Sequence, residues 1–336
     1  MRDKFPEALA AVNQLLFPKI RLAILLLAAA GQIPRAGSQP LPGSYAVDTV
    51  RYDWFDAARN REVPVKIYYP ASHGGGSALF PVIIFSHGLG GSREGYQYLG
   101  EYWAAHGCVS VHLQHIGSDR AVFNGVGLLD LKEAMIMALA DPQNTINRAR
   151  DVSFAIDQLE RLNATNSPLQ SKLDLNRIGI AGHSFGAQTA LVAVGEQLPV
   201  LMENLADRRI KAAIAMSVPV PEGVAPMLDD IRVHVFVMSG TEDVGFTRAE
   251  DRRVPFDRIL TAGTALVIFN GVDHMTFSGH PGLRGREKDG KFQPLICVAT
   301  TAFWDAHLRG DPQAQNWLNQ GGFARFIGDE GRFEIK

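Results

Sequence analysis

Cysteine is scarce in this chain of 336 residues, and its charges nearly cancel. Its two cysteines, Cys108 and Cys297, cannot form a disulfide framework, and both lie in apolar stretches typical of small core residues. The 33 basic and 35 acidic side chains leave a net charge of −2, which argues against nucleic acid or anionic lipid as a partner. A composition of 46% hydrophobic and 20% charged residues predicts a globular protein with a sizeable core.

The chain also lacks a long apolar run. The longest, Leu22–Ala30, follows Lys19 and Arg21 and is shorter than the roughly 20 apolar residues that a membrane-spanning helix needs. It has the length of the apolar region of a signal peptide, so export is favoured over a cytoplasmic location. The alternative is an amphipathic helix broken at Pro18. In either case residues 1–42 are predicted to be an appendage and residues 43–336 a single domain.

Strand-like and helix-like segments alternate after residue 44. The predicted helices cover residues 96–105, 147–162, 185–194 and 295–308. The predicted strands cover residues 45–55, 63–69, 81–86, 108–113, 177–181, 211–216, 233–238 and, as the last, 265–269. This alternation predicts an α/β fold with a mainly parallel central sheet and helices on both faces. Residues 117–146 are predicted to be an insertion over one end of the sheet.

One pentapeptide carries the sharpest chemical signal. Gly182-His183-Ser184-Phe185-Gly186 lies between a predicted strand and a predicted helix, which is the setting that the nucleophile-elbow motif G-x-S-x-G requires. The glycines allow a tight turn that strains the serine backbone. Ser184 is therefore the candidate nucleophile.

A serine hydroxyl needs a histidine base, and in this motif the histidine follows the serine along the chain. Four histidines do so: His234, His274, His280 and His307. His234 lies within a predicted strand and His307 within the closing helix. His274 follows the last predicted strand, at the edge where open α/β sheets bind ligands. His274 is thus the candidate base, and His280 on the same loop is the alternative.

The third member of such a triad is a carboxylate that orients the histidine. Asp243 follows the next-to-last predicted strand, at the same edge of the sheet, and Glu242 is its competitor. The preceding strand, residues 211–216, is followed by no carboxylate before Glu222. Asp243 is therefore the candidate acid.

An oxyanion hole needs two N–H donors. One is expected from Phe185, directly after the serine, and the other from Leu89 in the glycine-rich loop after the strand 81–86. The string His73-Gly74-Gly75-Gly76 resembles an oxyanion motif of some lipases, but it precedes that strand and is predicted to be a hairpin loop.

The chain resembles the α/β-hydrolases related to dienelactone hydrolases and platelet-activating-factor acetylhydrolases. The likeness runs from about residue 45 to 318 and is carried by residues 53–61, 67–70, 85–90, 182–186 and 303–308. It implies the α/β-hydrolase fold and a serine esterase, free of metal and cofactor, that works through an acyl-enzyme. Position by position it implies Ser184 as the nucleophile, with Leu89 and Phe185 as oxyanion donors.

Two features depart from these families. Dienelactone hydrolases proper use a cysteine nucleophile, where this chain has Ser184. The acetylhydrolases place their acid after the strand equivalent to residues 212–216, where this chain has none. Both departures argue against the families' own substrates, and the second returns the acid to Asp243.

The substrate is predicted from the residues near the triad. Phe246, Met275 and Phe277 are expected to border the pocket. Apolar residues of the insertion either cap an acyl pocket or pack in the core, namely Met135, Ile136, Met137 and Leu139. Such a lining favours a neutral small-molecule ester of short or medium acyl chain.

Alternatives to ester hydrolysis have weaker support in the sequence. His112 and His115 are too poor in neighbouring ligands to predict a metal site. Acyl transfer to an alcohol needs the same triad as ester hydrolysis. A catalytically silent binding module on the same fold is the non-enzymatic alternative.

Overall fold

The computed structural model describes residues 45–71, 79–127, 130–197, 204–221, 223–245, 247–279 and 287–336, with the side chains of 287–289 left aside. The predicted appendage (residues 1–42), the loop 73–76, Glu222, Phe246 and His280 lie outside the described residues. The predictions for them stay predictions.

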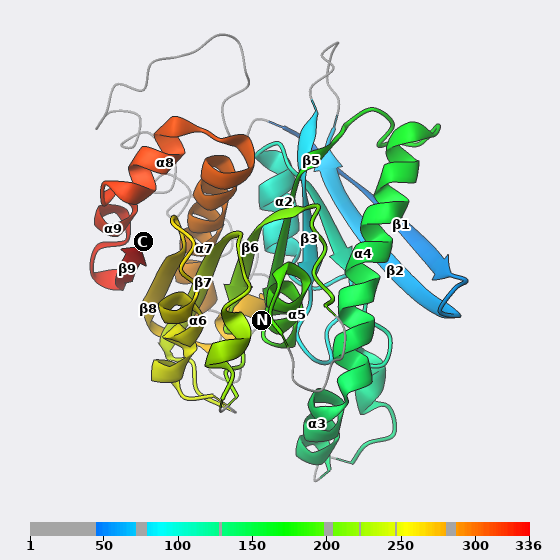
Figure 1. Cartoon of the computed structure of the whole chain (residues 1–336), viewed down its shortest axis with the longest axis horizontal. Coiled ribbons are helices and arrows are strands. Elements are labelled where there is room, and N and C mark those ends of the chain that lie inside the picture. The colour runs from blue at the N-terminus through cyan, green and yellow to red at the C-terminus, as the bar shows by residue number, and fades with distance from the viewer. Residues whose placement is uncertain are drawn as a thin grey trace, which may run out of the picture. The chain divides into compact units, whose positions relative to one another are not determined.

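The centre of the fold is a sheet of nine strands in the order β1-β2-β4-β3-β5-β6-β7-β8-β9 (Figure 1). Strands β3 to β8 form one parallel run, while β1, β2 and β9 pair antiparallel at the two edges. The mainly parallel α/β-hydrolase fold is thereby confirmed. The strands are Val47–Asp56, Arg61–Pro70, Phe80–Ser86, Val109–Leu113, Leu173–His183, Ile210–Met216, His234–Glu242, Ala265–Asp273 and Gly331–Ile335.

The prediction that residues 265–269 form the last strand is wrong. Strand β9 pairs with β8 from Ala265↔Ile335 to Phe269↔Gly331. Phe333 and Ile335 pack against the core, while Arg332, which precedes them, is exposed. Five residues give only two apolar positions, too short an alternation to distinguish this edge strand from a tail.

The helices are α2 (Gln97–Ala105), α3 (Leu131–Ala140), α4 (Pro142–Ala164), α5 (Phe185–Val194), α6 (Val254–Arg258), α7 (Glu287–Trp304), α8 (Pro312–Asn319) and α9 (Gly322–Ile327). Helix α4 begins five residues before the predicted start at Asn147. Asp141 accepts a hydrogen bond from the Gln143 N–H, and Pro142 occupies the first turn, both of which favour a helix start there. Within the described part of the chain, no helix is long and apolar enough to cross a membrane.

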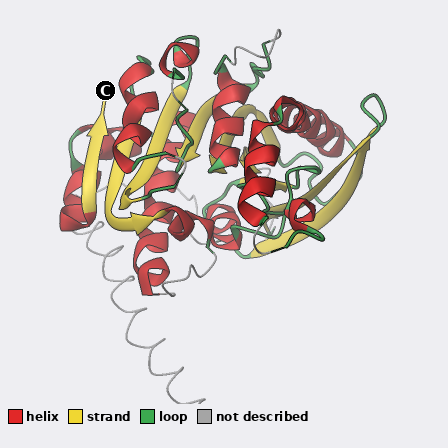
Figure 2. Ribbon diagram, turned by 90° about the horizontal axis from the view of Figure 1, so that it is seen from below, coloured by secondary structure: helices red, strands yellow, loops and turns green. Residues whose placement is uncertain are grey.

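Helices lie on both faces of the sheet (Figure 2), and each face has its own apolar core. One core joins the sheet to α4 and α5, through residues such as Val152, Ile156 and Leu191. The other joins it to α2 and α7, where the fully buried rings of Trp103 and Trp304 meet edge to face at 6.0 Å. Burial of such large side chains contributes about 1.5–3 kcal/mol each to stability. The two cores hold the strand ends, and hence the loops, in fixed places.

The insertion lies beyond the sheet, where α3 contacts the 3₁₀ turn Arg120–Phe123 and the start of α4 (Figure 1). Ile136 and Met137 are 44% and 66% exposed, so core packing does not account for these two. Met135 and Leu139 are half-buried. The insertion therefore keeps an apolar outer surface that the core does not use.

A buried arginine connects the elements around the carboxyl ends of the parallel strands. Arg148 on α4 is fully buried, and its guanidinium donates hydrogen bonds to Thr189 Oγ1 at 2.8 Å, Ser118 Oγ at 2.8 Å and Ser86 Oγ at 3.1 Å. It also donates to the carbonyl oxygen of His87. Burial lowers the pKa of Arg148 to about 9, so it remains cationic at neutral pH. One side chain thus ties α4 to α5, β3 and the insertion.

Next to this cation lies a Ser-His-Asp chain that is separate from the predicted triad of Ser184, His274 and Asp243. Ser86 Oγ is 2.9 Å from His115 Nε2, and His115 Nδ1 is 3.0 Å from Asp151 Oδ2. All three side chains are fully buried, and Arg148 also donates to Ser86, so this serine is no accessible nucleophile. Burial lowers the pKa of His115 to about 4, and the nearby positive charge of Arg148 acts in the same direction.

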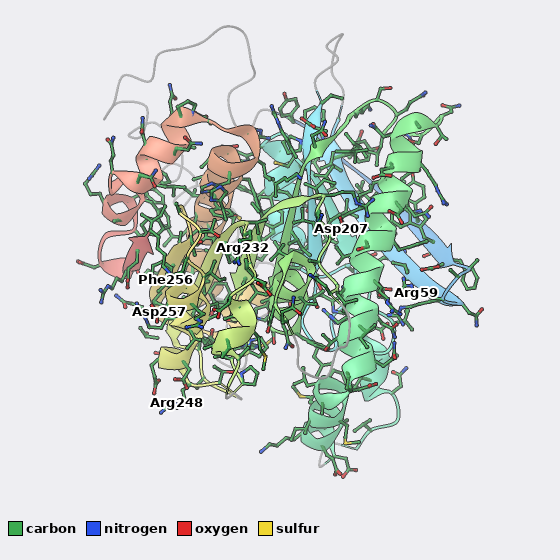
Figure 3. All side chains as sticks on the ribbon, in the orientation of Figure 1. Arg59, Asp207, Arg232, Arg248, Phe256 and Asp257 are labelled. Carbon is green, nitrogen blue, oxygen red and sulfur yellow. The ribbon has the colours of Figure 1, made fainter. Side chains whose placement is uncertain are left out.

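Two arginines from the β1–β2 hairpin neutralise Asp151. Arg61 donates to both of its carboxylate oxygens, at 2.8 and 2.9 Å. Arg59, labelled in Figure 3, lies 2.8 Å from Asp151 Oδ1. The antiparallel edge of the sheet is in this way attached to α4 by charge as well as by apolar packing.

Replacing Arg148 by methionine is expected to lower the free energy of unfolding by about 3–5 kcal/mol, because it leaves buried acceptors without a donor. Urea unfolding followed by circular dichroism would measure the change. Arg161→Met is the matched control, since Arg161 is exposed on the same helix and should change stability by less than about 0.5 kcal/mol. Equal stability of the two variants would contradict the structural role of the cation.

Candidate active site

The backbone of Ser184 adopts an unusual conformation between β5 and α5, with φ of 56° and ψ of −121°. Its N–H donates to the Met216 carbonyl at 2.9 Å. A Cβ at Gly182 would lie 2.1 Å from the Gly186 carbonyl oxygen, and one at Gly186 would lie 1.9 Å from the Ser86 carbonyl oxygen. No side chain fits at either glycine, which explains both fixed positions of the motif.

The fold brings Ser184, His274 and Asp243 together from three separate strand ends. His274 Nε2 lies 3.0 Å from Ser184 Oγ, and His274 Nδ1 lies 3.0 Å from Asp243 Oδ1. The His274 side chain is 30% exposed, whereas Asp243 is fully buried. The chain of hydrogen bonds thus runs from a partly open serine to a sheltered carboxylate, which is the geometry of a Ser-His-Asp triad.

The Asp243 carboxylate is held on both oxygens. Oδ2 accepts from Ser217 Oγ at 2.5 Å and from Ser239 Oγ at 2.9 Å, while the Arg252 guanidinium lies 3.1 Å from Oδ1. Burial alone would raise the pKa of Asp243. The hydrogen bond from His274 and the charge of Arg252 outweigh burial, and the pKa lies below its ordinary value. Asp243 is therefore ionised at neutral pH.

Sequence reasoning missed Ser217 and Arg252. Ser217 is the first residue after β6, with φ of 51°, at the strand end where the resemblance had placed an acid. Arg252 sits in the 3₁₀ turn Ala249–Arg253 and donates to the carbonyls of Ser217 and Val218, each at 2.8 Å. The position of Ser217 directly after β6 could have indicated its role. Nothing in the sequence around Arg252 indicates that this residue contacts the triad.

The neighbouring carboxylates have other positions. Glu242 is exposed and lies opposite Asp273 in the register of β7 with β8. Asp273 Oδ1 accepts from the N–H groups of Met275 and Thr276, at 3.1 and 3.0 Å, and so caps the 3₁₀ turn that begins at His274. Asp273 thus positions the backbone of His274, whereas its ring is held by Asp243.

The other two histidines that follow Ser184 within the described residues, His234 and His307, lie away from the triad. His234 is the first residue of β7, and its ring stacks on that of His307 at 4.1 Å. His307 belongs to the π-helical turn Asp305–Arg309, which follows α7 and replaces the last part of the predicted closing helix. Burial lowers the pKa of His307 to about 4.

The backbone N–H groups of Leu89 and Phe185 have no protein acceptor among the described residues. The Gly88 carbonyl accepts from His87 Nδ1 at 2.6 Å and from the Gly91 N–H at 3.0 Å. Because the peptide is planar and trans, the Leu89 N–H points the opposite way. Phe185 is the first residue of α5, so its N–H has no intrahelical partner. Both groups remain the predicted oxyanion donors.

A cavity of about 460 Å³ adjoins the triad histidine. It is lined by Thr241, Glu242, Val244, Asp273, His274 and Met275. Met275 is 42% exposed and lines this cavity, and its contact with substrate stays a prediction. The position predicted for Phe277 is wrong, because the capped turn directs its side chain inward, fully buried, with its ring 6.2 Å from that of His183.

The two histidines weighed as metal ligands use both ring nitrogens within the protein. His112 contacts the Gly95 carbonyl at 3.1 Å and Ser110 Oγ at 3.0 Å, and His115 binds Ser86 and Asp151 as described. In the part of the chain that the structure describes, no three His, Cys, Asp or Glu side chains gather as a metal site would require.

Ionisation of Asp243 is expected to contribute to stability. Its folded-state pKa lies below the ordinary value of 3.8, so the contribution is fully present above the unfolded-state pKa and is lost as pH falls through the folded-state pKa. The difference in melting temperature between the wild type and Asp243→Asn should therefore be largest near neutral pH and shrink below about pH 4.

Thermal melts at a series of pH values would measure this difference. Asp251→Asn is the control, because Asp251 forms an exposed pair with Arg248 that is screened by solvent. A difference for Asp243→Asn that stays constant from neutral to acid pH would contradict the depressed pKa.

Comparison with known proteins agrees with the reading from the fold. The family model of platelet-activating factor acetylhydrolase, isoform II, matches residues 58–124. The platelet-activating factor acetylhydrolase of Cavia porcellus is 27% identical over 179 residues, 46% of this chain and 38% of that protein. The acetylhydrolase of Canis lupus familiaris is 27% identical over 164 residues, 41% of this chain and 34% of that protein.

The chain thus spans little more than a third of the length of the curated relatives that it matches. The matched family segment runs from the β1–β2 hairpin through the glycine-rich loop to the start of the insertion. The chain has the α/β-hydrolase fold and resembles the platelet-activating factor acetylhydrolases.

Proposed function

We propose that this protein is a serine-dependent carboxylic ester hydrolase that works through an acyl-enzyme on Ser184. The observation that carries the proposal is the pair of 3.0 Å contacts from Ser184 Oγ through His274 to Asp243, beside a cavity. The similarity to acetylhydrolases supports the same class of reaction.

In the first half-reaction, Ser184 Oγ attacks the ester carbonyl carbon while His274 Nε2 takes the hydroxyl proton. The carbonyl oxygen becomes negative and receives hydrogen bonds from the Leu89 and Phe185 N–H groups. His274 then gives its proton to the leaving alkoxide, the C–O bond to the alcohol breaks, and the acyl group stays on Ser184.

In the second half-reaction, His274 takes a proton from water, and the hydroxide attacks the acyl carbon. The bond to Ser184 Oγ breaks, the serine regains its proton from His274, and the carboxylic acid leaves. Asp243 keeps the proton of the neutral imidazole on Nδ1 and stabilises the imidazolium in both steps. The carboxylate of Asp243 is suited to both roles, because four nearby donors hold it in place and it does not have to reorganise during the reaction.

The lining of the cavity supports a neutral ester of short or medium acyl chain. Val244 and Met275 supply apolar surface, and Glu242 and Asp273 oppose an anionic substrate. The relatives' name specifies an acetyl group and a lipid, platelet-activating factor, so an acetylated phospholipid belongs in the substrate panel beside simple esters.

The proposal is tested by intact-mass labelling with a fluorophosphonate, together with turnover of p-nitrophenyl esters from acetyl to dodecanoyl. The wild type should take one adduct and show an optimum of chain length. Ser184→Ala should take none and lose roughly 10⁴-fold or more in kcat, as triad deletions do.

Circular dichroism of Ser184→Ala and labelling of heat-denatured wild type are the controls for folding and for nonspecific reaction. Absence of an adduct on the folded wild type would refute the serine nucleophile and favour a binding module. An adduct without turnover of any ester, but with transfer to an added alcohol, would replace hydrolysis by acyl transfer.

A further inference from the structure

Two buried side chains link the glycine-rich loop to the loop of His274. The Gly88 N–H donates to Tyr96 Oη at 3.2 Å, and Tyr96 Oη lies 2.8 Å from His183 Nδ1. His183 Nε2 lies 2.9 Å from the carbonyl oxygen of His274. Three hydrogen bonds therefore connect the residue before Leu89 with the backbone of the proposed base.

The direction of these bonds follows from their ends. A backbone N–H can only donate and a backbone carbonyl can only accept. Tyr96 Oη therefore accepts from Gly88 and donates its own proton to His183 Nδ1, and His183 Nε2–H donates to His274. The other tautomer of His183, with its proton on Nδ1, would set an unprotonated Nε2 against the carbonyl of His274 and leave that carbonyl without this donor.

Burial holds both side chains in the protonation state that this direction requires. Tyr96 is 5% and His183 is 2% exposed. Burial raises the pKa of Tyr96 to about 12. Burial, and then the nearby charge of a protonated His274, keep the pKa of His183 well below its ordinary value. Both groups are therefore neutral around neutral pH. The three hydrogen bonds from Gly88 to His274 are called the relay below.

The backbone is strained where it places Tyr96. Tyr96 has φ of 59° and ψ of 29° at the start of α2, a left-handed conformation that is unfavourable for a residue with a side chain. Its ring packs on Phe85 at 4.5 Å. A Cβ at Gly88 would meet Tyr96 Oη at 3.2 Å and His183 Nδ1 at 3.3 Å. The absence of a side chain at Gly88 thus lets the Tyr96 hydroxyl and the His183 ring lie close to the backbone of the loop.

Tyr96 also completes the support of the loop that carries Leu89. The carbonyl of the peptide between His87 and Gly88 accepts from Arg148, while the N–H of the same peptide donates to Tyr96. The next peptide is held through its carbonyl by His87 and Gly91. Of the four polar groups in these two peptides, the Leu89 N–H alone lacks a protein acceptor within the described residues.

We propose that Tyr96 and His183 are positioning residues that set the Leu89 N–H and His274 in register with Ser184. The inference rests on the proposed ester hydrolysis and extends it to groups that do not touch the substrate. His183 is part of the nucleophile elbow, directly before Ser184, and its ring lies 4.7 Å from that of His274. Loss of the relay should loosen the oxyanion donor relative to the base, which affects the transition state more than the bound substrate.

The central test is Tyr96→Phe, which removes one oxygen and keeps the ring. We expect kcat on the best p-nitrophenyl ester to fall about tenfold while KM stays within about twofold, because only transition-state stabilisation is lost. The second-order rate of fluorophosphonate labelling should fall by a similar factor, since that reaction also develops charge on the oxyanion.

The matched control is Tyr102→Phe. Tyr102 lies on the same helix with its ring stacked on His106 at 3.9 Å, and its hydroxyl has no part in the relay. It should keep kcat within about twofold of the wild type. Thermal melts of both variants separate a positioning effect from a loss of folding.

A second variant interrupts the same chain of hydrogen bonds at His183. His183→Gln places an amide near the Nε2 position and leaves Tyr96 without its acceptor. The double variant Tyr96→Phe with His183→Gln should be no slower than the slower single variant, because both changes break one chain of bonds. Multiplied losses in the folded double variant would overturn the relay.

The outcomes keep this inference apart from the proposed function. If the folded wild type neither labels nor hydrolyses esters, the proposed function fails first. If the wild type is active and folded Tyr96→Phe has kcat within twofold of it, or raises KM at constant kcat, the positioning role alone is refuted.

Discussion

The strained backbone of Ser184, with its positive φ, is the constraint on which the rest of the site depends. It turns the chain from β5 into α5 within one residue, so the serine hydroxyl stands above the sheet and the first free N–H of the helix stands beside it. The turn is feasible only because Gly186 passes close to the Ser86 carbonyl. That contact seats α5 against the end of β3, and the loop that carries Leu89 starts from the same place.

Polar groups, rather than disulfides, hold the loops around this turn. His87, His112, His115 and His183 are all buried, and each has both ring nitrogens engaged within the protein. Burial lowers the pKa of all four. A buried polar network of this kind contributes little net stability, but a mispaired member is costly, so it selects one arrangement of the loops.

The carboxylate of the triad follows β7, and not β6 as the resemblance to the acetylhydrolases implied. In this chain Ser217 occupies the position after β6, and Asp243 reaches the same histidine from the position after β7. The hydroxyl and the carboxylate meet at 2.5 Å, so the two strand ends converge on one point. Arg252 completes the pair by binding the backbone of one and the carboxylate of the other.

The sequence by itself determined the parallel sheet, the elbow, and the candidates Ser184, His274 and Asp243, because each depends on a local pattern. Apolar runs mark buried strands, glycines mark a tight turn, and residues just after parallel strands share one edge of the sheet. Strand β9 and the start of α4 were misjudged, because an edge strand of five residues and a proline-led first turn carry weak periodicity.

Only the tertiary structure decided the side-chain partners across distant elements. The burial of Phe277, the contacts of Ser217 and Arg252 with Asp243, and the path from Gly88 to His274 involve residues far apart in the chain. His183 and His274, for example, are 91 positions apart. A hydrogen bond depends on distances within a few tenths of an ångström. Such distances are set by the packing of the two cores and not by any pattern along the chain, which is why the sequence identified the reactive groups but not their supports.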